Sequence, residues 1–253
     1  MTFNSCMELF FKILRFVERK AAFCRGKGYG SATIRQEVKL VYELLGKSPT
    51  LAIDIGGNVG DYSAELRRRN KELEIHIFEP SSANIKKLNA HFADDRLIKI
   101  LPYAVSDSHG TAPLFSDVPG SGAGSLTLRR LDHINVTFSH RETVNTMRFE
   151  TYWKDVLKRR TIDIVKLDIE GHELFALTGF GEAINSVRII QFEFGGCNID
   201  TRIFFQDFWY FFQHHHYEIF RITPLGAEKI RCYQETDEFF STTNYIARNQ
   251  KMP

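Results

Sequence analysis

The sequence predicts an α/β fold built on a doubly wound, mostly parallel β-sheet, and three observations support this. Short apolar segments of strand length alternate with segments of helix length through most of the chain. Acidic residues stand at the ends of three of the apolar segments, at Asp54, Glu79 and Asp168. The chain ends in a helix, a strand, a turn and a strand, so the last strand is predicted to run antiparallel at or near a sheet edge.

Seven strands and five helices are predicted in the sheet-forming part of the chain. The strands cover residues 51–55, 74–78, 97–101, 162–167, 188–194, 217–222 and 243–247. The helices cover residues 61–70, 81–92, 152–158, 173–177 and 201–214. The sequence at 106–110 predicts a turn, and the glycine-rich segment 119–125 predicts a long mobile loop that could act as a lid.

Two helices are predicted ahead of the sheet. Residues 8–22 place apolar side chains on one face and charged side chains on the other. Residues 31–45 begin at a Ser/Thr cap and stop at Gly46, after a glycine-rich break at 25–30. We therefore divide the chain into an N-terminal helical lead-in, residues 1–46, and an α/β domain, residues 47–253.

The apolar face of the first helix has two interpretations. It could pack on its own domain or on a second subunit, which would form a homodimer, and packing is the commoner use of such a face. Alternatively, its basic and phenylalanine-rich character suits peripheral contact with an anionic membrane surface. Removal of residues 1–25 would separate the two, because only the membrane interpretation predicts a loss of liposome binding.

Composition excludes several classes of protein. The 33 Lys and Arg residues against 31 Asp and Glu give a net charge of +2, which lacks the strongly basic signature of a nucleic-acid-binding protein. Cys6, Cys24, Cys197 and Cys232 form no C-x-x-C pair, so a reducing compartment is favoured over a disulfide framework or a zinc ribbon. There is no signal-peptide pattern and no apolar run near the ~20 residues that span a bilayer, so we expect a cytoplasmic protein.

The turn after the first strand predicts the kind of ligand. In a doubly wound sheet, ligands bind outside the carboxyl ends of the strands, where the strand order reverses. The turn reads Asp54-x-Gly56-x-Asn58-x-Gly60, without the G-x-G-x-x-G spacing that a dinucleotide pyrophosphate needs. A carboxylate ahead of Gly56 favours a cationic ligand, and S-adenosylmethionine carries both ammonium and sulfonium charges. A purely structural turn of Asp, Gly and Asn is the alternative.

Glu79 adds to this hypothesis. It closes the second strand 23 residues after Gly56, close to the spacing at which an acidic side chain binds ribose hydroxyls. Alternatively, Glu79 is an acid before Pro80 that stabilises the N-terminus of the following helix.

These segments resemble the FkbM family of S-adenosylmethionine-dependent methyltransferases, over about residues 51–247. The resemblance is carried by residues 54–60, by Phe78-Glu79-Pro80, Ala104-Val105-Ser106 and Gly124-Ser125-Leu126, and most specifically by residues 164–173. The last segment is an apolar strand that ends in Lys-x-Asp-x-Glu-Gly-x-Glu. Departures are modest: Gly57 stands where the family often has alanine, His172 stands where a small residue is common, and Phe149-Glu150-Thr151 replaces a Leu-Asp-Asp-like stretch before the fourth strand.

The resemblance implies a class I methyltransferase, Rossmann-like sheet of seven strands with the last antiparallel. It also implies O-methylation of a hydroxyl on a sugar, glycan, glycolipid or related metabolite. The cofactor-binding residues are then expected to be Asp54, Gly56, Gly57, Asn58, Gly60, Glu79, Pro80, Ala104 and Asp168. A nicotinamide-dependent oxidoreductase and a noncatalytic module that binds an adenosyl ligand are the alternative functions.

Transfer to a hydroxyl needs a general base or a metal ion, and several candidates follow the fourth and fifth strands. His172 is the natural base because its ordinary pKa is near neutrality, although it could also cap or be solvated. Glu170 and Glu173 are further candidates, or else acids that favour a helix N-terminus. Asp168, Glu193 and His172 could instead hold a divalent ion such as Mg²⁺, which we do not favour.

Two charged residues interrupt apolar strands. Glu193 lies in Gln191-Phe192-Glu193-Phe194, where a charge needs a functional reason, and we count it among the catalytic candidates. Lys166 would be costly if it were buried without a partner, so it should pair with a neighbouring acid or reach solvent at the sheet end.

Overall fold

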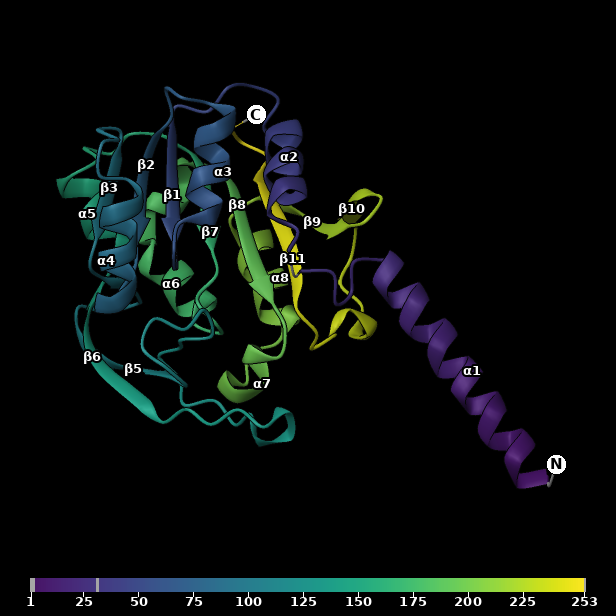
Figure 1. The fold of residues 1–253 in the computed structure, drawn as a ribbon. Coiled ribbons are helices and arrows are strands. Elements are labelled where there is room, and N and C mark those ends of the chain that lie inside the picture. The colour runs from purple at the N-terminus through teal and green to yellow at the C-terminus, as the bar shows by residue number, and fades with distance from the viewer. Residues whose placement is uncertain (1–2, 31, 253) are drawn as a thin grey trace.

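A central β-sheet with helices on both faces forms most of the molecule (Figure 1). The computed structural model describes residues 3–30 and 32–252, and of residues 3–6 it describes the backbone alone. The strands of the main sheet are β1 (Leu51–Ile55), β2 (Glu74–Phe78), β3 (Ile98–Leu101), β7 (Ile162–Leu167), β8 (Val187–Phe194), β9 (Tyr217–Thr223), β10 (Gly226–Ile230) and β11 (Thr243–Asn249).

The strand order of this sheet is β10-β9-β11-β8-β7-β1-β2-β3. Strand β1 runs parallel to β2 and to β7, and β8 runs parallel to β7. The predicted fold class is confirmed: all seven predicted strands are present, and the last, β11, runs antiparallel to its neighbours β8 and β9. One detail differs. Strand β11 lies near the edge, third in the sheet, but the hairpin partner of β9 is an additional edge strand, β10, and not β11.

Most of the helices lie on the faces of the sheet, whereas α1 (Phe3–Cys24) extends away from it. The others are α2 (Ile34–Leu45), α3 (Asp61–Arg69), α4 (Ser82–His91), α5 (Phe149–Asp155), α6 (Glu173–Gly179), α7 (Cys197–Thr201) and α8 (Phe205–His214), with short 3-10 turns at Asp132–Ile134, Gly181–Ser186 and Glu235–Asp237. The helix predicted over about 201–214 is observed as α8 from Phe205, because Arg202 adopts a left-handed conformation (φ 57°) that ends the short α7 before α8 starts. The helix predicted from Ser31 is observed as α2 from Ile34, and Ser31 itself lies outside the described residues.

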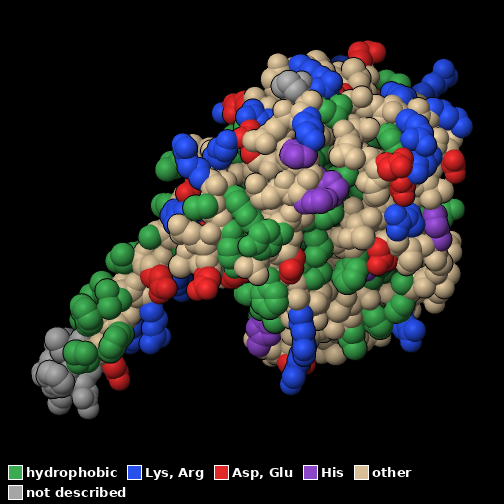
Figure 2. Space-filling view, turned by 180° about the vertical axis from the view of Figure 1, so that it is seen from behind, with side chains coloured by type: hydrophobic (Ala, Val, Ile, Leu, Met, Phe, Trp, Pro, Cys, Tyr) green, Lys and Arg blue, Asp and Glu red, His purple; other side chains and the backbone are tan. Residues whose placement is uncertain are grey.

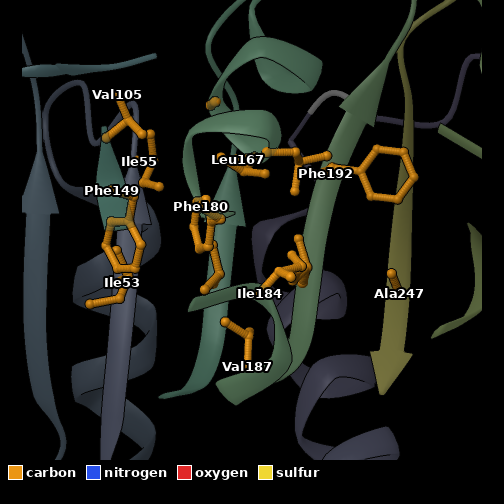
Figure 3. Close-up of a cluster of buried hydrophobic side chains, with 14 of the residues drawn as sticks. Ile53, Ile55, Val105, Phe149, Leu167, Phe180, Ile184, Val187, Phe192 and Ala247 are labelled. Atoms are coloured by element: carbon orange, nitrogen blue, oxygen red, sulfur yellow. The ribbon is translucent and has the colours of Figure 1, made fainter. Parts of the chain in front are cut away.

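Two hydrophobic layers hold the helices to the sheet, because alternate residues of a strand point to opposite faces. On one face, α2, α3 and α4 contribute Val41, Leu66 and Leu88, which pack with Ala52 and its neighbours. On the other face, α5, α6 and α8 pack against a cluster rich in aromatic rings. Figure 3 shows Phe149 and Phe180 in this second layer, lying over the strands that carry Ile53 and Leu167. The main sheet is thus covered on both faces. The carboxyl ends of its parallel strands are not covered by these helices.

A second, small sheet lies beyond the carboxyl ends of the main strands (Figure 1). It consists of β4 (Ala104–Val105), β5 (Gly110–Ser116) and β6 (His140–Met147), in the order β4-β6-β5. Strands β5 and β6 are not predicted from the sequence. Strand β6 is mostly polar, and both strands are partly exposed. Their buried apolar residues are Leu114 and Val144, which form a small cluster with Ala104.

Helix α1 extends away from the rest of the molecule, whereas α2 contacts α3, β8 and β11 (Figure 1). The boundary between a lead-in and a domain at residues 46 and 47 stays a prediction. No described helix combines the length and the apolar character that crossing a membrane requires. Cys24, Cys197 and Cys232 form no disulfide, and the side chain of Cys6 lies outside the described residues.

Candidate functional site

The strand order reverses between β1 and β7, and this is where the predicted site residues come together. These two strands pair in parallel with Asp54 opposite Lys166, so the turns that follow them are neighbours. The backbone N–H of Asp168 donates to Ile55 O at 3.1 Å. Gly56 has a φ of 85°, and a Cβ on it would lie 2.0 Å from Asp168 O, so no other residue fits this contact. The glycine turn is therefore a requirement of close packing between the two strand ends.

The larger cavity opens at this point and has a volume of about 700 Å³, including its mouth. Eight of the predicted site residues line it: Gly56, Asn58, Glu79, Pro80, Ala104, Asp168, Glu170 and His172. Phe78, Tyr103 and Val105 give it an apolar wall. An apolar wall with a few polar groups is typical of small-molecule sites.

A smaller and more polar cavity of about 590 Å³ adjoins the first. It shares Gly56, Asn58, Gly122, Asp168 and Glu170 with the larger cavity, and it adds Asp54, Gly57, Lys166 and Glu193. Gly60 lines neither cavity: it caps α3 with a φ of 94° and lies against Phe92. Apart from Gly60 and Glu173, each predicted site residue thus lines one or both of these adjoining cavities.

Glu79 is the best-positioned acid of the larger cavity. Its carboxylate accepts hydrogen bonds from the backbone N–H of Asn58 and of Ser81, both at 2.8 Å. Asn58 also accepts, through Oδ1, a hydrogen bond from Asn84 Nδ2 at 3.0 Å. Burial raises the pKa of Glu79 to about 7. Glu79 therefore fixes the glycine turn and the start of α4, and it still lines the cavity.

Asp54 and Lys166 form a buried ionic cluster beneath the polar cavity. Asp54 is fully buried; its Oδ2 accepts from Ser63 Oγ at 2.6 Å, and its Oδ1 has no hydrogen-bond partner among the described residues. Lys166 Nζ lies 2.9 Å from Asp168 Oδ2 and 5.1 Å from the centre of the Tyr62 ring. The expectation that Lys166 pairs with a neighbouring acid is confirmed. Negative charges at Asp168 and Asp54 raise the pKa of Lys166 in spite of its burial, so it is a cation.

Glu170 connects the site to the loop between β5 and β6. Arg129 Nη1 donates to its carboxylate, and Ser125 Oγ donates to its backbone oxygen at 2.8 Å. Its backbone is left-handed (φ 55°), which is uncommon for a residue other than glycine and typical of functional turns. Arg129 was not predicted, because it lies 41 residues away in the chain and inside no recognisable motif. The glycine-rich loop is thereby held over the site.

His172 occupies a different place from the other acid–base candidates. Its Nε2 lies 2.9 Å from Ser106 Oγ, and its ring stacks on Phe175 at 4.7 Å. Burial lowers the pKa of His172 to about 4, so the imidazole is neutral at neutral pH. As a base it is therefore weak, and its geometry suits contact with a ligand in the larger cavity.

Glu193 lines the polar cavity without a hydrogen bond to its carboxylate in the part of the chain that the structure describes. Burial raises its pKa well above the ordinary value, and the negative charges of Asp168 and Glu170 raise it further. A carboxylate with a raised pKa that faces a cavity is a suitable general base.

The predicted metal-ligand set is not brought together. Among the described residues, Glu170, Glu193 and Cys197 are the three potential ligands whose donor atoms lie within 4.8 Å of one another. His172 instead faces Ser106, and Asp168 pairs with Lys166. The combination of Asp168, Glu193 and His172 is therefore wrong as a ligand set, because the strand ends meet while Asp168 and His172 have other partners and Glu193 lies with Glu170 and Cys197.

Glu173 is enclosed in the protein interior and cannot reach a substrate. Its Oε1 accepts from the backbone N–H of Ile169 at 2.9 Å and of Gly171 at 3.2 Å, and its Oε2 is buried without a hydrogen-bond partner among the described residues. The structure thus favours the alternative in which this carboxylate stabilises the turn ahead of α6. Burial raises the pKa of Glu173 to about 7 from its ordinary value of 4.5.

This raised pKa leads to a test of stability against pH. Between the two pKa values the unfolded chain loses this proton and the folded chain keeps it, so the contribution to stability falls as the pH rises from 4.5 to about 7. Glu173→Gln stays neutral, so we expect this variant to gain stability relative to the wild type between about pH 5 and about pH 8. Urea unfolding at several pH values measures the difference, and Glu72→Gln, at an exposed site, is the control. Parallel curves for the wild type and Glu173→Gln would contradict the assignment.

The comparison with protein families agrees with the geometry of the site. The model of the methyltransferase FkbM domain matches residues 54–228, from the carboxylate of the glycine turn to β10. The chain belongs to this methyltransferase family. The predicted resemblance to FkbM methyltransferases is confirmed, and with it the prediction of a methyltransferase.

Individual relatives are more distant. A methyltransferase of Sordaria araneosa, sdnD, is 28% identical over 155 residues, which are 51% of this chain and 60% of that protein. The match thus spans less than two thirds of that relative. A solved FkbM methyltransferase of Methylobacillus flagellatus KT is 17% identical, with a TM-score of 0.47 and coverage of 79% of this chain and 44% of that one. The plantazolicin methyltransferase BpumL, solved with SAH, is 8% identical, with a TM-score of 0.47 and coverage of 93% and 88%.

Proposed function

We propose that this chain uses S-adenosylmethionine to methylate a hydroxyl group of a sugar, glycan, glycolipid or related metabolite. The observation that carries the proposal is the position of Glu79, whose carboxylate lines the larger cavity beside the glycine turn where the strand order reverses. S-adenosylmethionine would supply a methyl group bound to a positively charged sulfur atom. The described residues fit this molecule in three respects.

First, the larger cavity has the chemistry of an adenosine site. Its wall of Phe78, Tyr103 and Val105 suits the flat, apolar faces of adenine, and the Glu79 carboxylate suits two neighbouring ribose hydroxyls. Secondly, Asp54 Oδ1 is a buried acceptor without a hydrogen-bond partner among the described residues, beside the polar cavity. Thirdly, the carboxylates of that cavity favour positive charge, and a bound cation would stabilise them in turn.

The polar cavity is the expected place of the acceptor. Its lining contains Asp61, Asp168, Glu170 and Glu193, which accept hydrogen bonds, and few apolar side chains. An acceptor with several hydroxyl groups donates to such a surface, whereas a phosphorylated or otherwise anionic acceptor is repelled by it. Glu193 would take the proton of the reacting hydroxyl. A divalent ion such as Mg²⁺ stays an alternative way of activating this hydroxyl, which turnover in the presence of a chelator tests.

Replacement of Glu79 by alanine tests the donor site. Loss of one or two hydrogen bonds to the charged carboxylate is expected to weaken S-adenosylhomocysteine binding by roughly 10- to 100-fold. Calorimetric titration measures this, and Glu72→Ala, on the exposed surface ahead of β2, should leave binding unchanged. Unchanged affinity of Glu79→Ala would remove Glu79 from the donor site.

The function itself is tested with three ligands and one product. We expect the wild-type chain to bind S-adenosylmethionine and S-adenosylhomocysteine, and to give a product heavier by one methyl group when it is incubated with a metabolite extract. Binding of NAD without either adenosyl compound would support a nicotinamide oxidoreductase instead. Binding of the adenosyl compounds without any methylated product would support a noncatalytic module. Cytoplasmic location and the lead-in boundary stay predictions.

A further inference from the structure

Helix α1 stands apart from the body of the molecule along most of its length (Figures 1 and 2). Every side chain from Met7 to Ala21 is exposed. The contacts that attach the helix lie at its carboxyl end, where Arg25 Nη2 lies 3.0 Å from Glu228 Oε1 and Gly26 lies against Ile222 O. Phe23 also packs edge-on against Tyr29, with ring centres 5.3 Å apart. The chain thus holds about six turns of amphipathic helix away from its own core.

The apolar surface of α1 is broader than a helix pair would cover. Met7, Phe10, Leu14 and Val17 follow the three- and four-residue spacing of a coiled-coil seam and are 39% to 56% exposed. A second stripe, with a spacing of seven residues, begins at Leu9 and continues through Phe16. In a two-stranded coiled coil this second stripe would point into water, because the seam is narrow.

The second stripe is as exposed as the first. Leu9 is 49% and Phe16 is 60% exposed, and Phe23 extends the stripe at 44%. A lipid surface covers a wide apolar arc at once, since the acyl boundary is continuous along the helix. The width of the apolar surface therefore favours lipid over a second copy of the chain.

The charges of α1 favour an anionic lipid surface. Between residues 8 and 20 the helix carries Lys12, Arg15, Arg19 and Lys20 against Glu8 and Glu18, an excess of two positive charges. Glu8, Lys12, Arg15 and Arg19 share the face opposite the seam, whereas Lys20 projects from between the two stripes, with its Nζ 5.6 Å from the centre of the Phe16 ring. The long side chain of a lysine in such a position can extend to lipid headgroups while its stem stays in the apolar layer.

We propose that α1 binds an anionic membrane surface and holds the methyltransferase domain against it. The helix lies in the interface with both apolar stripes in the lipid and its basic residues at the headgroup level. This proposal does not depend on the reaction of the domain, because α1 contributes no residue to either cavity of the site.

Flotation of the full chain with vesicles tests the proposal. We expect the wild type to float with vesicles of phosphatidylcholine and phosphatidylglycerol and to bind much less to phosphatidylcholine alone. Phe10→Asp with Phe16→Asp puts one charge in each stripe and should lower partitioning by roughly tenfold or more. Lys12→Gln with Arg15→Gln should lower it by about fivefold per residue, on anionic vesicles only. Leu225→Asp, at a site 90% exposed in the turn between β9 and β10, is the matched control and should float as the wild type does.

Three outcomes would overturn the proposal. In the first, the wild type is absent from the floating fraction. In the second, the variant with Phe10→Asp and Phe16→Asp floats as well as the wild type does. In the third, the wild type is a dimer, the variant is a monomer, and neither binds vesicles. Titration with S-adenosylhomocysteine on the same samples is independent of these results. Normal affinity for S-adenosylhomocysteine in a variant that no longer floats shows that the domain is folded. If the wild type does not bind S-adenosylhomocysteine, this counts against the proposed function and not against the role of α1.

Discussion

Glu193→Gln is expected to slow methyl transfer by about 100- to 10,000-fold, the usual contribution of a general base. The carboxylate lines the polar cavity next to Asp168 and Glu170, and no hydrogen bond occupies it among the described residues. Burial and these negative charges raise its pKa, and a bound cationic donor would favour the ionised form, which can accept a proton from a hydroxyl. Glutamine keeps the shape of the side chain and removes the base.

The measurement is a comparison of turnover with binding. S-adenosylhomocysteine affinity should change little in Glu193→Gln, because Glu79 and the glycine turn of the larger cavity are untouched. Glu72→Gln, an exposed glutamate, should match the wild type in both assays. Turnover of Glu193→Gln at the wild-type rate would exclude the base, and a parallel loss of turnover and affinity would indicate a binding role instead.

Lys166→Met is expected to lower the free energy of unfolding by about 3–5 kcal/mol, the usual cost of removing one partner of a buried ion pair. Lys166 is buried between Asp54 and Asp168, with its Nζ 2.9 Å from Asp168 Oδ2. Methionine fills the same space but leaves the buried Asp54 and the half-buried Asp168 without the cation. The loss should be seen in urea unfolding of the chain without ligand.

The pH dependence identifies the cause of this loss. Burial raises the folded-state pKa of Asp54, and the charge of Lys166 holds that rise in check. Without Lys166 the pKa of Asp54 rises further, so the deficit should be small near the ordinary carboxyl pKa of about 4 and grow as the pH rises. Lys99→Met is the matched control, because Lys99 also lies in a strand but its ion pair with Glu74 is exposed at 3.5 Å. That pair should contribute at most about 1 kcal/mol. A deficit in Lys166→Met that does not change with pH would mean lost packing, not unpaired charge.

The sequence could predict which segments form the site, because the strand ends carry their own signals. An apolar strand followed by Asp54-x-Gly56 and another followed by Asp168 predicted two turns at one sheet edge, and the parallel pairing of β1 and β7 makes them neighbours. Gly56 must be glycine for a reason that is local in space, the contact with Asp168 O. Such signals can be recognised in a single sequence because the backbone geometry of one turn requires a particular residue type.

The roles of the individual acids could not be predicted in the same way. Glu170, Glu173 and Glu193 are the same residue type within 24 positions of one another. One pairs with Arg129, one is enclosed by backbone N–H groups, and one faces a cavity, and these environments come from segments far apart in the chain. The small sheet of β4, β5 and β6 is a related case, because its strands are partly exposed and lack a continuous apolar pattern.

By itself the sequence determined the α/β order of elements, the glycine turn, the acid at Glu79 and the amphipathic character of the first helix. Each of these depends on the spacing of residues along one segment. Only the tertiary structure decided which carboxylates are accessible, that Lys166 is enclosed as a cation, and that α1 stands away from the core with both apolar stripes exposed. Burial and charge pairing depend on contacts between distant segments, and these contacts exist only once the chain is folded.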